Sequence, residues 1–496
     1  MKMNLCSDSW IPVRWQDSRQ SRVGLRTLLE RSSEIADLVL APHERISVMR
    51  LLVCIVQRAI NGPETVEDRE ECRDEIVPKS LAYLDQWHSA FELIGENGAF
   101  LQFANVEPDK EGRYTPLSKL NMTKASGNNP ALFDNGDYRA DAVDLGRLAI
   151  DLLTYQNFSV GGTIGIAWWN GELTAPQAPD TVSEAPCVCS SAIHLIMKGP
   201  NLLDTLAMNL IPFNAVCPAL RGIGVPVWEK MPVSASDTEA VANASLTYLG
   251  RLVPVSRCVK LLPDLNGCVN ANGVKYPSKV DSQLVYYEHT MTLMRIEKDN
   301  RMVAVGADPG KSLWRSLPSL LHRFRKNYVL PAVLDNDTMP DQLDVWIGAM
   351  VVDKAKIVDI LEDSFAHMAP GSVDGPQFEV MVDLMKKAEA AAFGLKGAVK
   401  TYLAGMTDAV KTAPDLPAHA ESNYWMTLTR HKELLAELAR KSAEGGTAAA
   451  ANKWLECVVA CARDAYESVA MKNTPRQLRA WANARQFLPS IKSLTL

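Results

Sequence analysis

The spacing of hydrophobic residues changes along the 496-residue chain and predicts a mixed first part followed by a helical last part. Residues 3–15 alternate apolar and polar side chains, as a half-buried strand does. Residues 42–59 and 141–155 repeat apolar side chains every three to four positions, which predicts two buried helices. Between residues 246 and 305, apolar runs such as 252–255 alternate with Asn-Gly turns and predict strands. We therefore expect an α+β fold for this part.

Beyond residue 370, alanine, leucine and lysine dominate and no strand pattern remains. Helical periodicity covers four stretches, at residues 377–403, 423–443, 447–469 and 475–487. Four helices with short connections are typical of an antiparallel bundle. The sequence thus predicts two domains, a large mixed α+β domain over residues 1–370 and a C-terminal four-helix bundle over residues 371–496.

Composition and charge narrow the possible functions. Hydrophobic residues make up 47% of the chain, which is enough to build two folded domains. The formal net charge is −6, so any binding to nucleic acid has to come from local basic patches rather than from an overall positive field. The first residues lack the apolar run of a signal peptide, and no segment reaches the roughly 18 apolar residues that span a bilayer. We expect a cytoplasmic protein without a membrane partner.

The cysteine and histidine pattern argues against metal binding and catalysis. The ten cysteines are scattered, apart from the pairs Cys187 with Cys189 and Cys457 with Cys461. Structural zinc needs paired ligands that these positions do not supply. Histidines such as His194 stand alone in apolar surroundings, and no nucleophile with an orienting base can be recognised. We expect no metal, no cofactor and no catalytic residues.

Residues 303–312 imitate a phosphate-binding loop, with the sequence Val-Ala-Val-Gly-Ala-Asp-Pro-Gly-Lys-Ser. A Walker A loop needs four residues between its glycines, because its amides wrap a phosphate. Only three residues separate Gly306 from Gly310, and one of them, Pro309, has no amide to donate. A turn is the favoured interpretation. The competing hypothesis, a phosphate-handling hydrolase, predicts ATP turnover that Lys311→Ala removes.

Two stretches carry local positive charge within the acidic chain. Residues 313–328 interleave basic and aromatic side chains, a composition that suits phosphate contact and base stacking but equally an amphipathic helix with solvated charges. Residues 471–496 contain no acidic residue and five basic ones, Lys472, Arg476, Arg479, Arg485 and Lys492. This second stretch suits contact with a nucleic-acid strand or with an acidic partner subunit.

The most informative motif is a glycine cluster that follows the helix predicted over residues 141–155. The sequence Tyr-Gln-Asn-Phe-Ser-Val-Gly-Gly-Thr-Ile-Gly occupies residues 155–165. Glycine lets bare backbone approach a ligand, at an entropic cost. One interpretation is therefore contact between main-chain groups and phosphate or base edges. The alternative is a tight turn between the helix and the next element.

Three motifs, in this order along the chain, resemble one family. Residues 8–13 read Asp-Ser-Trp-Ile-Pro-Val, a long polar loop at 126–138 carries Leu132, Phe133 and Asp134, and the glycine cluster follows. These motifs resemble those of the large subunit of the type I-E CRISPR surveillance complex, called Cascade (the CasA family). The resemblance covers the whole chain, including a helical C-terminal part.

The resemblance implies a function and a set of partners. The large subunit binds at the 5′ handle of the guide RNA beside the other Cascade subunits and reads the protospacer-adjacent motif in double-stranded target DNA. It helps to start strand separation for guide RNA pairing and positions the recruited helicase-nuclease. We therefore expect a subunit that is not an enzyme. The alternative is a helical-bundle scaffold that docks partners without nucleic-acid contact, which predicts salt-insensitive assembly.

The resemblance also implies which residues touch nucleic acid. The family's glycine loop corresponds to Gly161 and Gly162, its lysine finger to Lys275, and its hairpin wedge to Lys354 and Ala355. Some members carry a glutamine in place of Lys354, and lysine stacks under a base pair less well than a flat amide. All three elements act from the minor groove, whose degenerate edges predict tolerant reading of the motif. The loop that reaches the guide RNA and the neighbouring subunit corresponds to Leu132, Phe133 and Asp134.

Overall fold

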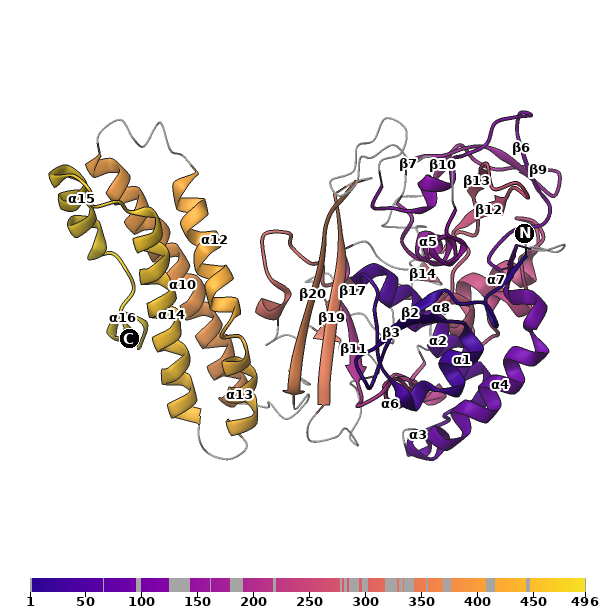
Figure 1. Ribbon diagram of the computed structural model, residues 1–496, viewed down its shortest axis with the longest axis horizontal. Helices are drawn as coiled ribbons and strands as arrows, with labels where there is room; N and C mark the ends of the chain where they lie inside the picture. Colours follow the sequence, from indigo (N-terminus) through magenta and orange to yellow (C-terminus); the bar gives the residue numbers. More distant parts are fainter. Residues whose placement is uncertain are drawn as a thin grey trace. The chain divides into compact units, whose positions relative to one another are not determined.

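The chain folds into two units, the first mixed and the second mainly helical (Figure 1). A computed structural model describes residues 2–65, 67–94, 100–124, 143–160, 162–178, 191–216, 220–276, 279–280, 283–284, 294–296, 302–316, 328–329, 333, 343–353, 356–368, 376–406, 415–442 and 447–495. The first unit comprises Met1–Gly310, Lys326–Met339 and Val345–Glu362, and the second comprises Lys311–Arg325, Pro340–Asp344 and Asp363–Leu496. The mixture of helices and strands, followed by C-terminal helices, confirms the predicted α+β class.

Helix α2 (Pro42–Ile60) is the centre of the first unit and confirms the helix predicted there. Pro42 occupies its first turn, where a missing amide costs nothing. The Glu44 carboxylate accepts a hydrogen bond from the Ala41 amide at 3.1 Å and so satisfies the helix start. Side chains are buried on all its faces, as expected of a helix enclosed by protein. It packs against α4 (Ile76–Gln86), α5 (Leu145–Phe158) and α8 (Tyr248–Leu252).

The described strands form sheets of two or three strands. Three-stranded sheets have the orders β3 (Gln20–Val23), β2 (Ile11–Trp15), β4 (Ile35–Leu38); β6 (Val106–Pro108), β8 (Ala167–Trp169), β9 (Glu172–Leu173); and β17 (Met302–Ala304), β16 (Met294–Ile296), β18 (Tyr328–Val329). A further sheet has the order β11 (His194–Lys198), β19 (Leu343–Asp353), β20 (Lys356–Met368). Two-stranded sheets join β1 (Met3–Asn4) to β5 (Glu92–Ile94), β7 (Gly162–Thr163) to β10 (Gln177–Ala178), β12 (Arg257–Leu261) to β13 (Cys268–Asn272), and β14 (Lys279–Val280) to β15 (Gln283–Leu284).

The other helices of the first unit are short. They are α1 (Leu25–Glu30), α3 (Asp68–Glu71), α6 (Leu202–Met208) and α7 (Thr238–Leu246), with 3-10 turns at Ser32–Glu34, Cys72–Glu75, His88–Phe91, Leu117–Leu120, Phe213–Ala215 and Val227–Glu229. The strand predicted over residues 252–255 is wrong, because α8 includes Leu252 and β12 begins only at Arg257. The Thr247 hydroxyl caps α8 by accepting a hydrogen bond from the Gly250 amide at 3.3 Å, which favours a helical turn here.

The second unit consists largely of packed helices. They are α10 (Pro376–Gly405), α12 (Leu416–Thr429), α13 (Glu433–Ser442), α14 (Thr447–Val469), α15 (Pro475–Arg485) and α16 (Ile491–Thr495). Trp314, in the 3-10 turn Leu313–Ser316, is fully buried in this unit and donates from its indole nitrogen to the Thr429 hydroxyl at 2.9 Å. Arg315 lies 3.7 Å from the ring of Trp425. Within residues 313–316, packing therefore favours the amphipathic interpretation of the basic and aromatic stretch.

The helix predicted over residues 423–443 is divided in the structure. Helix α12 starts earlier, at Leu416, and ends at Thr429, and α13 starts at Glu433. Between them Lys432 donates to the Asp363 carboxylate and to the Ser364 carbonyl, the latter at 2.9 Å. These contacts come from a segment almost seventy residues away in the chain. The local apolar pattern cannot indicate them, and it therefore predicts one unbroken helix.

Candidate nucleic-acid interface

The glycine cluster follows directly from the buried end of helix α5. The helix begins at Leu145, where Asp144 caps it by accepting from the Arg147 amide at 3.1 Å, and it continues to Phe158, past the predicted end at residue 155. Phe158 and Ser159 are 2% and 1% exposed, so the chain emerges only after them. The buried Phe158 and Ser159 therefore fix the position from which the glycine cluster begins.

Two polar side chains lock this end of α5. The Gln156 amide group accepts from the Arg257 backbone nitrogen at 2.9 Å and donates to the Arg257 carbonyl at 2.8 Å, so it pairs with β12 as a neighbouring strand would. Asn157 accepts a hydrogen bond from the Arg50 guanidinium of helix α2 at 2.9 Å. Both side chains are fully buried. Polar groups at such positions are tolerated because each is paired.

Beyond Phe158 the chain reaches the surface and pairs briefly with another segment. We call residues 160–165 the glycine loop. Gly162 and Thr163 form β7 and pair antiparallel with β10, Ala178 opposite Gly162 and Gln177 opposite Thr163. Thr163 is exposed, and Val160, Ile164 and Gly165 are half-buried. Gly161 lies outside the described residues, so the structure describes one of the two predicted DNA-binding glycines.

The far end of the glycine loop is attached to strand β13. Gly165 forms a parallel bridge with Ala271. A Cβ atom on Gly165 would lie 2.7 Å from the Asn270 carbonyl oxygen, so only glycine fits without displacing backbone. The glycine at this position is therefore explained by packing.

Lys275 lies on the chain that continues from the same strand. After β13 the Gly273 amide donates to the Ser256 carbonyl at 3.1 Å and the Val274 amide donates to the Val255 carbonyl at 3.0 Å. The Lys275 side chain is exposed, and its two neighbours are buried. One of these, Tyr276, accepts a hydrogen bond on its hydroxyl from the Val255 amide at 2.8 Å. The hairpin β12–β13 thus carries both the glycine loop and Lys275.

Positive charge gathers beneath this hairpin. Arg257 is 2% exposed, and its Nη2 donates to the Val160 carbonyl at 3.0 Å. Lys119, in the 3-10 turn Leu117–Leu120, is half-buried nearby, and burial together with the positive charge of Arg257 lowers its pKa. These two cations, with Gln156 and Tyr276, are the supporting residues that sequence reasoning missed. The contacts of Gln156 and Arg257 join segments about a hundred residues apart and leave no local pattern.

The remaining predicted contact residues fall outside the described part of the chain. Strands β19 and β20 are neighbours in their sheet, with Asp353 and Lys356 at the ends that flank Lys354 and Ala355. Lys354 and Ala355 themselves are not among the described residues, and neither are Leu132, Phe133 and Asp134.

The turn after strand β17 does not have the form of a nucleotide site. Gly306 bridges to Ala192, and the Gly310 amide donates to the Asp308 carboxylate at 2.9 Å. A phosphate loop needs such amides to point at its ligand and needs a helix to follow. Here a 3-10 turn at Leu313–Ser316 follows. The described residues therefore favour the turn interpretation of this motif.

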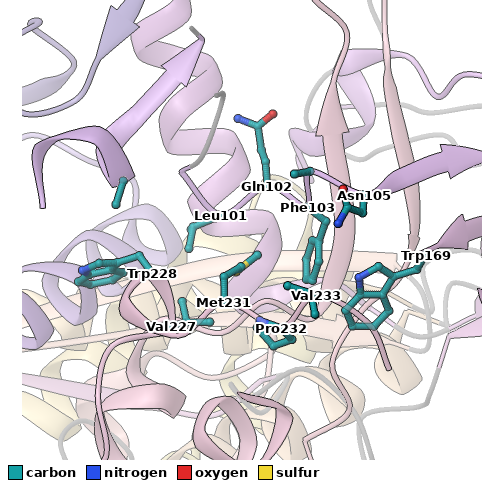
Figure 2. A pocket seen from close by; sticks show the side chains of 12 residues that line it. Leu101, Gln102, Phe103, Asn105, Trp169, Val227, Trp228, Met231, Pro232 and Val233 are labelled. Atoms are coloured by element: carbon teal, nitrogen blue, oxygen red, sulfur yellow. The ribbon is translucent and has the colours of Figure 1, made fainter. Parts of the chain in front are cut away.

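The first unit contains an apolar cavity of about 230 Å³. Figure 2 shows Trp169 and Trp228 on either side of Met231, with Pro232 and Phe103 nearby. None of the described residues that line it is ionisable, so it offers no general acid, base or nucleophile.

The buried histidines and the acidic and sulfur side chains do not form a chemical centre in the described residues. His194 is completely buried with its pKa lowered to about 3 by burial, and its ring meets Phe158 edge-on at 6.0 Å. Within the described part of the chain, no three His, Cys, Asp or Glu side chains gather closely enough to hold a metal ion. No described helix combines the length and apolar character needed to cross a membrane.

The basic C-terminal stretch is exposed over much of helix α15. Arg476 and Arg479 are exposed, whereas Lys472 pairs with Glu467 at 2.6 Å. Lys472 and Arg485 both lie over the ring of Trp481, at 4.7 and 4.9 Å. The exposed arginines suit a nucleic-acid strand and an acidic subunit equally, because each of these partners presents negative charge.

The chain is similar to known proteins over most of its length. The family described as CRISPR-associated protein Cse1 matches residues 4–465. The CRISPR-associated protein CasA/Cse1 of Thermus thermophilus is 27% identical over 412 residues, which cover 80% of this chain and 76% of that protein. The crystal structure of Thermobifida fusca Cse1 is 20% identical, with a TM-score of 0.76, and covers 100% of this chain and 98% of its own. A chain of a CRISPR RNA-guided surveillance complex is 17% identical, with a TM-score of 0.71 and coverage of 98% and 99%.

Proposed function

Because the chain belongs to the Cse1 (CasA) family, the large subunit of type I-E Cascade, we propose that it recognises the protospacer-adjacent motif in double-stranded DNA. In this proposal it works as a non-catalytic, cytoplasmic subunit beside the other Cascade subunits and the guide RNA 5′ handle. It helps to start strand separation for guide RNA pairing and positions the recruited helicase-nuclease.

One observation supports this proposal most strongly. The glycine loop and the exposed Lys275 are both attached to the hairpin β12–β13, although more than a hundred residues separate them in the chain. Gly165 bridges to β13, and Lys275 is the third residue after the end of that strand. A main-chain segment and a cation held on one rigid hairpin suit a groove edge and its phosphates. Neither feature requires the overall charge of the chain to be positive.

The proposed site contacts DNA mainly through main-chain groups, and this limits how well it can distinguish one base pair from another. Main-chain groups at Gly161 and Gly162 and the ammonium of Lys275 would meet minor-groove edges that distinguish A·T from G·C and little more. Opening the first base pairs costs about a few kcal/mol, and guide pairing then exchanges one duplex for another at near balance. A small favourable free energy from protein–DNA contacts is therefore sufficient to start strand separation.

The remaining contacts complete the proposal by resemblance. Lys354 and Ala355, between β19 and β20, would enter the duplex as the wedge. The polar loop would reach the guide RNA 5′ handle and the neighbouring subunit through Leu132, Phe133 and Asp134. A lysine at the wedge suggests phosphate contact in place of stacking.

The proposal is tested by binding measurements on the assembled complex with three targets: a duplex with the motif, the same duplex with a scrambled motif, and a single strand complementary to the guide. Gly161→Asp or Gly162→Asp places charge and bulk where backbone would meet DNA. We expect each to weaken binding of the motif duplex by at least about tenfold, about 1.4 kcal/mol. Lys275→Ala should weaken it less. Binding of the single strand should be unchanged in all three variants.

The same measurements can contradict the proposal. If both aspartate variants bind the motif duplex as the parent complex does, the glycine loop does not read DNA. If the parent complex binds both duplexes equally, the protein does not read the motif, and if the three variants bind every target as the parent complex does, the scaffold alternative is favoured. Salt dependence gives a further distinction, because phosphate contacts weaken as salt rises and a purely apolar docking surface does not.

A further inference from the structure

The buried Arg257 connects the end of helix α5, strand β12 and the glycine loop. Its guanidinium donates from Nη2 to the Val160 carbonyl at 3.0 Å and from Nη1 to the Ser256 carbonyl at 3.0 Å. The Tyr155 hydroxyl acts on it as well and opposes the lowering of its pKa by burial. Val160 immediately precedes Gly161. One side chain thus fixes the carbonyl from which the glycine pair departs.

This arrangement is a costly one for stability alone. The side chain is 2% exposed, and burial lowers its pKa. The described groups that act on its charge are Tyr155 and Cys258, and no carboxylate is among them. Carbonyl dipoles have to replace the lost water, and a well-packed apolar side chain would avoid that cost altogether. Arginine offers something that an apolar residue does not, because its planar fork of donors holds two separate carbonyls at once.

The glycine loop is fastened to the same hairpin at both ends. Arg257 holds the Val160 carbonyl at its start, and Gly165 bridges to Ala271 at its finish. The hairpin also fixes the chain that leads to Lys275, through the Gly273 amide on the Ser256 carbonyl. Ser256 therefore lies at the junction, since its carbonyl accepts from both Arg257 and Gly273.

We propose that Arg257 is a positioning residue for DNA reading, which holds the glycine loop at a fixed spacing from Lys275. This inference rests on the proposed function of the glycine loop and Lys275. Arg257 itself is buried and does not touch DNA. Its contribution is to keep the loop in the geometry that binds. When only a fraction of molecules hold that geometry, the apparent affinity falls by the same fraction.

Arg257→Lys tests the inference, because it retains the positive charge but not the planar fork. We expect the variant complex to bind the motif duplex about tenfold more weakly, corresponding to about one molecule in ten with a correctly placed loop. Its affinity for a single strand complementary to the guide should be unchanged. Hydrogen exchange at the amides of residues 159–165 should accelerate, while exchange in α2 stays the same.

Arg69→Lys is the matched control. Arg69 is also buried, at 8% exposed, and also donates to a carbonyl, that of Met208 at 3.3 Å, but it lies away from the hairpin in α3. It undergoes the same chemical change and should leave binding of both targets unchanged. If the Arg257→Lys chain does not assemble, Tyr155→Phe removes a hydroxyl that acts on the guanidinium and leaves the cation in place. A smaller loss, confined to the motif duplex, is then expected.

The results separate this inference from the proposed function. Equal losses on duplex and single strand would give Arg257 a merely structural role and overturn the inference, as would unchanged binding with unchanged exchange. If Gly162→Asp weakens the motif duplex and Arg257→Lys does not, the proposed function stands and the inference fails. If Gly162→Asp has no effect, the proposed function itself fails.

Discussion

Replacing Gly273 by alanine should displace the segment that carries Lys275. An added Cβ atom would lie 2.5 Å from the Val255 carbonyl oxygen and 2.8 Å from both the nitrogen and the carbonyl carbon of Arg257. All three neighbours are backbone atoms of the hairpin, so no side chain can rotate away. The chain at residue 273 therefore has to move, by about half an ångström if nothing else yields.

The cost of this movement follows from the bonds it stretches. The Gly273 amide lies 3.1 Å from the Ser256 carbonyl, and the Val274 amide lies 3.0 Å from the Val255 carbonyl. Losing both, at about 1 kcal/mol each, lowers the free energy of unfolding by about 2 kcal/mol. The larger effect should fall on DNA binding, because Lys275 lies two residues beyond the displaced backbone.

Urea unfolding of the isolated chain measures the first effect, and binding of a motif-bearing duplex to the assembled complex measures the second. Gly397→Ala is the control: Gly397 lies inside α10, and an added Cβ atom there would meet no group within 4 Å apart from its own helical turn. Alanine at that position favours the helix by about 1 kcal/mol. A Gly273→Ala chain as stable as its parent, with undiminished binding of the motif duplex, would refute the proposed role of this close approach.

Two further predictions concern stability. Burial lowers the pKa of His43 to about 4 and that of His194 to about 3, so below pH about 6.5 the unfolded chain binds protons that the folded chain does not. The free energy of unfolding should therefore fall by about 2 kcal/mol for each histidine as the pH drops from 7 to 5. The raised pKa of Asp151 opposes this fall slightly, because the folded chain then binds a proton more readily than the unfolded chain. In urea unfolding measured across this pH range, His43→Gln should make the free energy of unfolding depend less on pH. Arg147→Met should cost about 3 kcal/mol of unfolding free energy, because it leaves the nearly buried carboxylates of Glu44 and Asp151 unpaired. Adding Glu44→Gln and Asp151→Asn to that variant should recover most of the loss, and no recovery would count against charge burial as the cause.

The helices could be predicted from sequence where packing follows the local apolar pattern. Helix α2 and the long helices α10 and α14 present apolar side chains at helical spacing, and the structure confirms each near its predicted range. The apolar pattern did not predict a helix boundary that is determined by contacts with a distant segment. The division between α12 and α13 depends on Lys432 and its bonds to Asp363 and Ser364, and nothing in residues 423–443 indicates those partners.

The candidate site also contains residues that the sequence could predict and residues that it could not. Its proposed contact residues, such as Gly162 and Lys275, could be found because the motifs that carry them resemble those of a family. The residues that hold them in place could not. Gln156 and Arg257 interact through side-chain bonds to backbone across about a hundred residues, and such pairs have no periodicity or spacing to detect. The sequence offered one signal of these supporting contacts, the polar residues at the end of an otherwise apolar helix, because a buried amide needs a hydrogen-bond partner.

The proposed recognition of DNA by main-chain groups would make unusual demands on the residues that hold the glycine loop. A side chain can adjust its rotamer to a ligand, but a carbonyl or amide moves only with the chain, so the loop has to be held within about half an ångström of its working position. Four groups supply that constraint, and each fixes backbone: the Gln156 amide, the Arg257 guanidinium, the Tyr276 hydroxyl and the bare Cα of Gly165. The hairpin β12–β13 therefore couples the two proposed reading elements mechanically, so a change at either end of the hairpin should alter both.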